Sequence, residues 1–244
     1  MVNPAEVKYN KWHKNLSKKE DSEWILKSPW YTSVNQLLPA EFQGRILEIG
    51  CGRGDFSLYL SQRYPNATVI GTDFSSYAVE LANSKIQPGT KNLKFKAENA
   101  ENLNFENERF DMVISCETLE HVANQDKMLN EVRRVLKKGG CYFITTENYF
   151  NAMILSWIKT WLLKKPFNSG SGLQPNENFM LFFLTVRRFR KAGFSQIKTL
   201  SNHIQWLLLP KVDPKKLCTE NVDNKWLKKL FKPFGRHFTY YGIK

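Results

Sequence analysis

The stretch Ile46-Leu47-Glu48-Ile49-Gly50-Cys51-Gly52-Arg53-Gly54-Asp55 decides the fold of this 244-residue chain. Its apolar start predicts a buried strand, and the three alternating glycines predict a tight turn that opens a helix. Glycine accepts positive φ and lets the backbone approach a ligand closely, while the N-terminus of the helix offers free N–H groups. The stretch therefore predicts a strand–turn–helix unit that binds a ligand at its turn.

The acids around this turn limit which ligand it takes. The spacing is GxGxG, so Asp55 occupies the third glycine position of the dinucleotide fingerprint GxGxxG, where its negative charge opposes a pyrophosphate. Asp73 ends the next predicted strand, about 20 residues after the last glycine, where doubly wound folds present a carboxylate to ribose hydroxyls. The pattern favours a nucleoside ligand without a pyrophosphate.

Strands and helices alternate outward from this unit. This alternation predicts an α/β fold of the Rossmann-like type: a seven-stranded, mostly parallel sheet with an antiparallel edge hairpin, helices on both faces and a helical lid. The expected strands are 45–49, 68–72, 93–97, 110–115, 141–146, 196–201 and 237–243, and the expected helices are 55–64, 75–85, 124–137, 151–163 and 184–192.

Several blocks in this order resemble the class I (Rossmann-like) S-adenosylmethionine-dependent methyltransferases, and among these the small-molecule type similar to ubiquinone-pathway O-methyltransferases. The blocks are the glycine turn, Asp73, ENAENL at 98–103, FDMVISCETLEHV at 110–122 and LNEVRRVLKKGGCYFIT at 129–145. The resemblance implies a methyltransferase domain over 42–244, preceded by an N-terminal helical lid at 1–41. Within that domain we expect an inserted lid at about 149–184 and a basic insertion at about 202–236.

The resemblance also implies a set of residues for the cofactor, S-adenosylmethionine. The glycine turn with Glu48 would hold the methionine end, Asp73 the ribose, and Asn99 with Ala100 the adenine. Position 99 is often Asp in this family, and Asn still accepts a hydrogen bond from an amine, but without charge. The full expected set is Glu48, Gly50, Cys51, Gly52, Gly54, Asp73, Phe74, Asn99, Ala100 and Cys116.

His121 is the candidate catalytic base. It follows the fourth predicted strand, at the carboxyl edge of the sheet where ligands bind, and an acceptor hydroxyl must lose its proton. The alternative is that it has no catalytic role, since a Leu-Glu-His-Val segment is common in this family. A further alternative is a divalent cation on Glu117, Glu120 and His121, because this block resembles the metal-binding segment of ubiquinone-pathway and small-RNA 2′-O-methyltransferases. We expect no metal.

Charge and aromatic residues concentrate in the last third of the chain. Residues 151–244 contain 17 Lys and Arg against 4 Asp and Glu, so the whole net charge of +13 lies there. This surface favours anionic partners, and tryptophans beside lysines suit a membrane interface. A lid over the acceptor pocket and plain core packing are the alternatives. No signal peptide is apparent, and the scattered cysteines indicate reduced thiols, so we expect a cytoplasmic protein, with peripheral contact to an anionic membrane as an option.

The expected activity is methyl transfer to an oxygen or nitrogen of a small or lipid-like acceptor, in small-molecule biosynthesis. An RNA methyltransferase is the first alternative, since aromatic and basic residues together suit single-stranded nucleic acid; no RNA-binding module accompanies them, so nucleic acid is the less favoured partner. A partner protein that binds the cofactor without catalysis is the second. Neither the acceptor nor the oligomeric state follows from the sequence.

Overall fold

The computed structural model describes residues 3–15, 28–149, 161–162, 174–204, 233 and 235–244. One sheet organises these residues, in the order β3-β2-β1-β4-β5-β7-β6. Its strands are β1 (Gly44–Ile49), β2 (Ala67–Asp73), β3 (Leu93–Ala97), β4 (Phe110–Cys116), β5 (Leu136–Glu147), β6 (Lys198–Ile204) and β7 (Gly235–Ile243). The helices are α1 (Pro4–Asn15), α3 (Pro29–Leu37), α4 (Asp55–Arg63), α5 (Ser76–Ser84), α6 (Gln125–Val135) and α8 (Phe182–Lys191).

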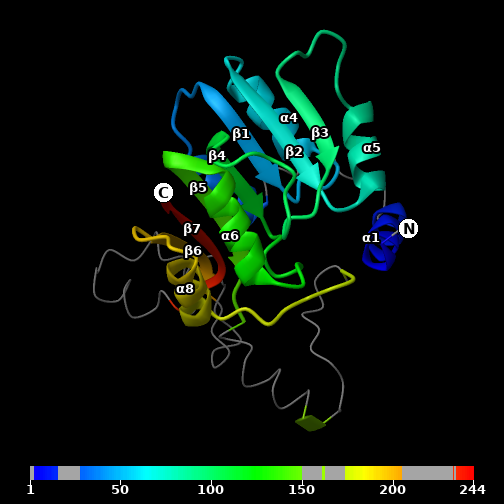
Figure 1. The fold of residues 1–244 in the computed structure, drawn as a ribbon. Helices are drawn as coiled ribbons and strands as arrows, with labels where there is room; N and C mark the ends of the chain where they lie inside the picture. Colours follow the sequence, from blue (N-terminus) through cyan, green and yellow to red (C-terminus); the bar gives the residue numbers. More distant parts are fainter. Residues whose placement is uncertain (1–2, 16–27, 150–160, 163–173, 205–232, 234) are drawn as a thin grey trace.

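The sheet confirms the expected fold class. The first five strands pair in parallel, and β7 lies antiparallel between β5 and β6. Apolar side chains on the two faces form two buried clusters. One cluster includes residues of α6 and α8, and the other includes residues of α3, α4 and α5. Figure 1 shows α6 and α8 on one face of this three-layer arrangement.

The boundary between α6 and β5 differs from the expectation. We expected a helix over 124–137 that ends before Gly139-Gly140 and a strand that starts at Cys141. Instead α6 ends at Val135 and β5 begins at once, because Leu136 already has extended backbone angles. Gly139 and Gly140 therefore lie inside β5, where the register with β4 shifts between Phe110 and Met112.

The lid and insertion predictions are only partly covered by the structure. The expected helix over 151–163 lies outside the described residues except for its last two positions before 163, which are helical. Most of the two expected insertions, at 149–184 and 202–236, is likewise outside them. The described part of the N-terminal segment consists of α1 and α3. Figure 1 shows α1 next to α5, beyond the ends of β2 and β3. The domain boundaries stay predictions.

Candidate functional site

A cavity of about 630 Å³ opens at the carboxyl edge of the sheet, where β1, β2 and β4 end. This volume is in the range of small-molecule sites. The wall includes most of the predicted residues: Gly50, Cys51, Gly52, Asp73, Phe74, Asn99, Ala100, Cys116 and His121. Glu48 and Gly54 are not on the wall. The parallel order of the strands explains the convergence, because their carboxyl ends meet at one edge.

The glycine turn crosses the end of β2, where Gly50 and Cys51 both donate their N–H groups to the Thr72 carbonyl, at 2.7 and 2.8 Å. Gly52 has φ +53°, and a Cβ added there would meet only the His13 ring, at 3.9 Å. Gly54, at φ +83°, has a different reason to be glycine, because a Cβ would lie 2.5 Å from the Phe95 ring. Gly52 thus keeps the cavity open, while Gly54 allows α4 to pack closely against the sheet.

Asp73 lies at the end of β2 with its carboxylate oriented by the backbone. The N–H of Gly52 donates to Oδ2 at 2.8 Å, and the N–H of Ser75 donates to Oδ1 at 2.9 Å. Burial raises the pKa of Asp73, while the neighbouring His13 and these N–H groups lower it. The carboxylate thus links the glycine turn to the start of α5. Its remaining lone pairs can still accept hydrogen bonds from a ligand in the cavity.

Glu48 lies behind the cavity wall. It is fully buried, and the Ser57 hydroxyl donates to its Oε2. Its Oε1 has no hydrogen-bond partner among the described residues. Burial raises the pKa of Glu48 to about 7, and the negative charges of Asp55 and Asp73 add to this. A buried carboxylate oxygen without a hydrogen-bond partner costs folding free energy. A cationic group of a ligand near this oxygen would offset that cost.

The predicted adenine loop follows β3 and is built around Asn99. The Asn99 side-chain oxygen accepts the N–H of Glu101 at 2.9 Å, and its backbone oxygen accepts the N–H of Asn102, also at 2.9 Å. The side-chain amide therefore shapes the turn with its oxygen. Ala100 is buried beside it in the core cluster that α6 covers. Asn99 and Ala100 lie on the cavity wall as expected from the sequence.

The N-terminal helices supply wall residues that the motifs did not identify. Tyr9, Trp12 and His13 come from α1, and Trp30 and Tyr31 from α3. The excess of aromatic residues in 1–40 was the available signal, since aromatic rings in such number are expected to be buried against other residues. It indicated that these rings pack on something, but it did not identify what.

His121 is held in one tautomer by its surroundings. Its Nδ1 lies 2.8 Å from the carbonyl oxygen of Asn176, which can only accept, so Nδ1 carries the proton. In the neutral ring Nε2 then keeps its lone pair. That atom lies 3.9 Å from Oε1 of Glu120. Burial raises the pKa of Glu120 to about 8, with the Glu117 charge adding to the effect.

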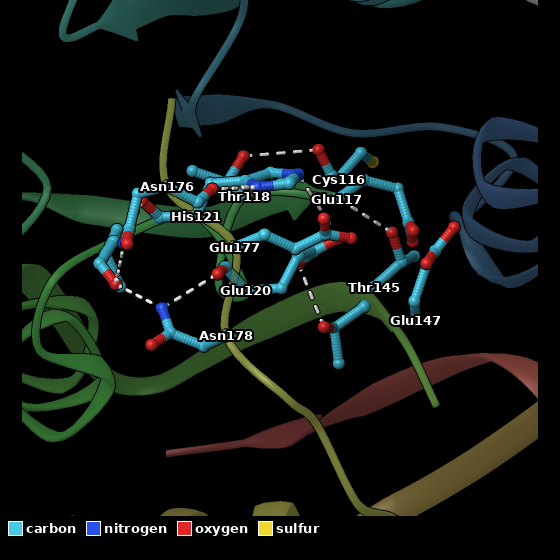
Figure 2. Close-up of polar contacts among 12 residues, drawn as sticks. Cys116, Glu117, Thr118, Glu120, His121, Thr145, Glu147, Asn176, Glu177 and Asn178 are labelled. Atoms are coloured by element: carbon cyan, nitrogen blue, oxygen red, sulfur yellow. Dashed lines mark hydrogen bonds and ion pairs between the residues drawn. The ribbon is translucent and has the colours of Figure 1, made fainter. Parts of the chain in front are cut away.

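Segment 174–180 fixes the loop after β4. Asn176 donates its amide to the carbonyls of His121 and Val122, at 2.9 and 3.0 Å. Asn178 donates to the carbonyls of Glu120 and Val122, at 2.8 and 2.7 Å. Figure 2 shows these asparagines, with Glu177, beside the loop that carries Glu120 and His121. Only the fold brings the two segments together, more than 50 positions apart in the chain.

Several carboxylates gather beside His121 at the ends of β4 and β5 (Figure 2). Glu117 has φ +49°, a left-handed backbone conformation that non-glycine residues rarely adopt and that is frequent at functional sites. Its Oε2 lies 3.3 Å from Nδ1 of His237. Glu147 accepts the hydroxyl of Tyr149, which is also 2.8 Å from Oε1 of Glu177.

The donor atoms that could share a metal are only partly those of the alternative set, because Glu117 alone is common to both. Oxygen and nitrogen atoms of Glu117, Glu147 and His237 all lie within 4.8 Å of one another, and this is the potential metal-holding group among the described residues. Glu120 and His121 are not part of this group: Glu120 accepts the Thr146 hydroxyl at 2.9 Å, and Nδ1 of His121 faces the Asn176 carbonyl. The N-cap of α6 is Asn124, whose side chain accepts the N–H of Lys127.

Comparisons with known proteins agree with this geometry. A family model described as "Methyltransferase domain" matches residues 42–177. The ubiquinone biosynthesis O-methyltransferase of Cereibacter sphaeroides (strain ATCC 17025) is 30% identical over 178 residues, 69% of this chain and 68% of that protein. The enzyme of the same name from Chelativorans sp. (strain BNC1) is 32% identical over 143 residues. That match spans 56% of both chains, so the similarity covers only part of these relatives.

Solved structures share the fold. A methyltransferase dependent on S-adenosylmethionine from Thermotoga maritima has a TM-score of 0.60 at 21% identity, with 97% of this chain and 93% of that chain covered. Phosphoethanolamine N-methyltransferase 2 of Haemonchus contortus, in complex with S-adenosyl-L-methionine, has a TM-score of 0.62 at 16% identity, with 100% of this chain and 60% of that chain covered. The family model matches more than half of the chain and covers the glycine turn, Asp73 and His121. The chain therefore belongs to the class I, S-adenosylmethionine-dependent methyltransferases.

Proposed function

We propose that this enzyme transfers the methyl group of S-adenosylmethionine to a hydroxyl oxygen of a small or lipid-like molecule. The observation that carries the proposal is the fixed tautomer of His121 on the cavity wall, which leaves Nε2 free to accept a proton. The relatives at about 30% identity carry the name O-methyltransferase, which supports oxygen as the acceptor atom. A hydroxyl nucleophile needs a base near neutral pH, whereas a neutral amine does not.

The residues present fit the cofactor. The glycine turn would hold the methionine end, and Glu48 behind the wall, whose buried Oε1 has no partner in the described part of the chain, would attract the ligand's ammonium through its charge. Asp73 would accept the ribose hydroxyls, and Asn99 with Ala100 would contact the adenine, while Phe74 and Cys116 complete the wall. The cofactor supplies a methyl group on a sulfonium, which is a good leaving group.

His121 would then act on the acceptor. Its Nε2 takes the proton of the hydroxyl as the oxygen attacks the methyl carbon, and Nδ1 stays bonded to the Asn176 carbonyl. Burial raises the pKa of Glu120 to about 8, so this carboxyl is largely protonated at neutral pH and places no negative charge beside Nε2. The walls from α1 and α3 would exclude water and align the acceptor with the methyl group.

A methyl-transfer assay with purified protein tests this proposal. Labelled S-adenosylmethionine and a panel of phenols, catechols and amines would be supplied, and we expect turnover with a hydroxyl acceptor. His121→Gln should lower kcat by about 10²–10⁴-fold with little change in the affinity for S-adenosylhomocysteine. A His121→Gln variant with the wild-type rate across pH 6–9 would refute the base. Cofactor binding without turnover on any acceptor would favour a non-catalytic partner protein. Strongly salt-dependent RNA affinity would favour an RNA methyltransferase.

We propose that the basic last third of the chain makes peripheral contact with an anionic membrane. Trp161 and Leu162 are 70% and 63% exposed, and among the described residues no helix is long and apolar enough to cross a bilayer. The protein should therefore pellet with acidic liposomes at low salt and be released at high salt. Trp161→Ala should weaken pelleting and leave cofactor affinity unchanged. Absence of pelleting at low salt would exclude the membrane contact.

A further inference from the structure

Helix α1 forms one side of the cavity and is tied to three parts of its rim. The Tyr9 hydroxyl donates to the His121 carbonyl at 2.9 Å. Asn10 accepts the Ser75 hydroxyl at 2.6 Å, after the end of β2. Arg53 of the glycine turn donates to the carbonyl of His13 at 2.9 Å. These bonds fix the position of the helix relative to the glycine turn and the loop after β2.

His13 is the buried residue of α1, at 6% exposed, and it lies on the cavity wall. Its Nδ1 is buried without a hydrogen-bond partner among the described residues, and its Nε2 is 3.9 Å from Oδ1 of Asp73. The ring edge at Cε1 faces Gly52, the glycine that keeps the cavity open.

The gap between His13 and Asp73 has the width of one hydroxyl group. At 3.9 Å the two atoms are too far apart for a direct hydrogen bond. An oxygen placed at about 2.8 Å from each, an ordinary hydrogen-bond length, would see them at an angle of about 90°. A hydroxyl is the group that fits there, because it can accept from an imidazole N–H and donate to a carboxylate at once.

The protonation states agree with this arrangement. Burial lowers the pKa of His13, with the Arg53 charge adding to the effect, while Asp73 opposes it. A neutral ring carries one proton, and the Asp73 carboxylate favours its place on Nε2. The carboxylate itself is already oriented by the N–H groups of Gly52 and Ser75, so it offers a fixed acceptor on the other side of the gap.

We propose that His13 is a further cofactor-binding residue, which donates its Nε2 proton to one ribose hydroxyl while that hydroxyl donates to Asp73. This inference rests on the proposed placement of the ribose at Asp73. It gives α1 a direct role in recognising a ribonucleoside, in addition to covering the cavity. The chemical class recognised is the vicinal diol of ribose.

Calorimetric titrations with S-adenosylhomocysteine and its 2′-deoxy and 3′-deoxy analogues test the inference. His13→Ala should weaken binding of the parent ligand by about 10-fold, as expected for one hydrogen bond. The same substitution should change affinity less than about 2-fold for the analogue that lacks the contacted hydroxyl. His13→Gln, whose amide can still donate, should recover part of the affinity, and Lys11→Ala on the exposed side of α1 is the matched control.

The outcomes separate this inference from the proposed function. If the wild-type protein binds S-adenosylhomocysteine and Asp73→Ala loses it, but His13→Ala weakens all three ligands equally, then His13 only packs and the inference is wrong. If the wild-type protein does not bind the ligand at all, both fail. Should His13→Ala not fold, as judged by its melting curve, the His13→Gln variant with the two deoxy analogues decides the question in the same way.

Discussion

Removal of the Asp73 carboxylate tests the cofactor site most directly. In Asp73→Ala, the ribose hydroxyls lose a charged acceptor, and hydrogen bonds to charged groups contribute about 1.5–3 kcal/mol each. Two such bonds at the lower limit give about 3 kcal/mol, so the dissociation constant for S-adenosylhomocysteine should rise by about 100-fold or more. The substitution also frees the N–H groups of Gly52 and Ser75, which are 2.8 and 2.9 Å from the carboxylate oxygens.

The loss of these two backbone contacts means that stability must be measured beside affinity. Removing the acceptor destabilises the turn, but removing a buried charge offsets part of this, since burial raises the pKa of Asp73. We therefore expect only a small change in the melting temperature, together with the large loss of affinity. Asp73→Asn keeps one oxygen acceptor and should lose about 10-fold, between wild type and Asp73→Ala.

Isothermal titration calorimetry with S-adenosylhomocysteine is the assay, and circular dichroism verifies the fold of each variant. Asp126→Ala is the matched control, because this carboxylate pairs with Arg188 and Lys191 at the distant contact between α6 and α8. A folded Asp73→Ala variant that binds within 3-fold of wild type would show that Asp73 does not hold the ribose.

Three further predictions concern the same site. Gly52→Val should abolish methylation at ordinary cofactor concentrations with the sheet intact, because valine resists φ +53° and its side chain enters the cavity; normal methylation would make the turn merely structural. Binding of S-adenosylmethionine at pH 6 should release protons, because Glu48, with its pKa raised to about 7, is protonated in the free protein and loses its proton beside a ligand ammonium; titrations in buffers of different ionisation enthalpy would detect this, and Glu48→Gln should eliminate it. Activity should survive EDTA, since the contact of 3.3 Å between Glu117 and His237 needs no cation to hold it; inhibition reversed by Mg²⁺, and absent after His237→Ala, would instead place a cation there.

The local pattern of the chain was sufficient to predict the fold and the residues that the sheet itself contributes to the cavity wall. Apolar runs, glycines and the acid at Asp73 act over a few neighbouring positions, and parallel strands bring their carboxyl ends to one edge whatever the loops contain. For this reason Gly52, Asp73, Asn99 and Cys116 all lie on one cavity wall, as expected. The end of α6 was missed, because the glycines at 139 and 140 suggested a turn where β5 continues through a register shift.

The sequence by itself determined the chemical class of this protein, because the blocks that carry the resemblance are each short and local and follow one another in order from the glycine turn to 129–145. The tertiary structure alone decided what surrounds that motif. It placed His13 beside Asp73, Asn176 beside His121, and His237 beside Glu117. These partners are 60, 55 and 120 positions apart in the chain, and such contacts depend on how whole elements pack, which no local periodicity encodes.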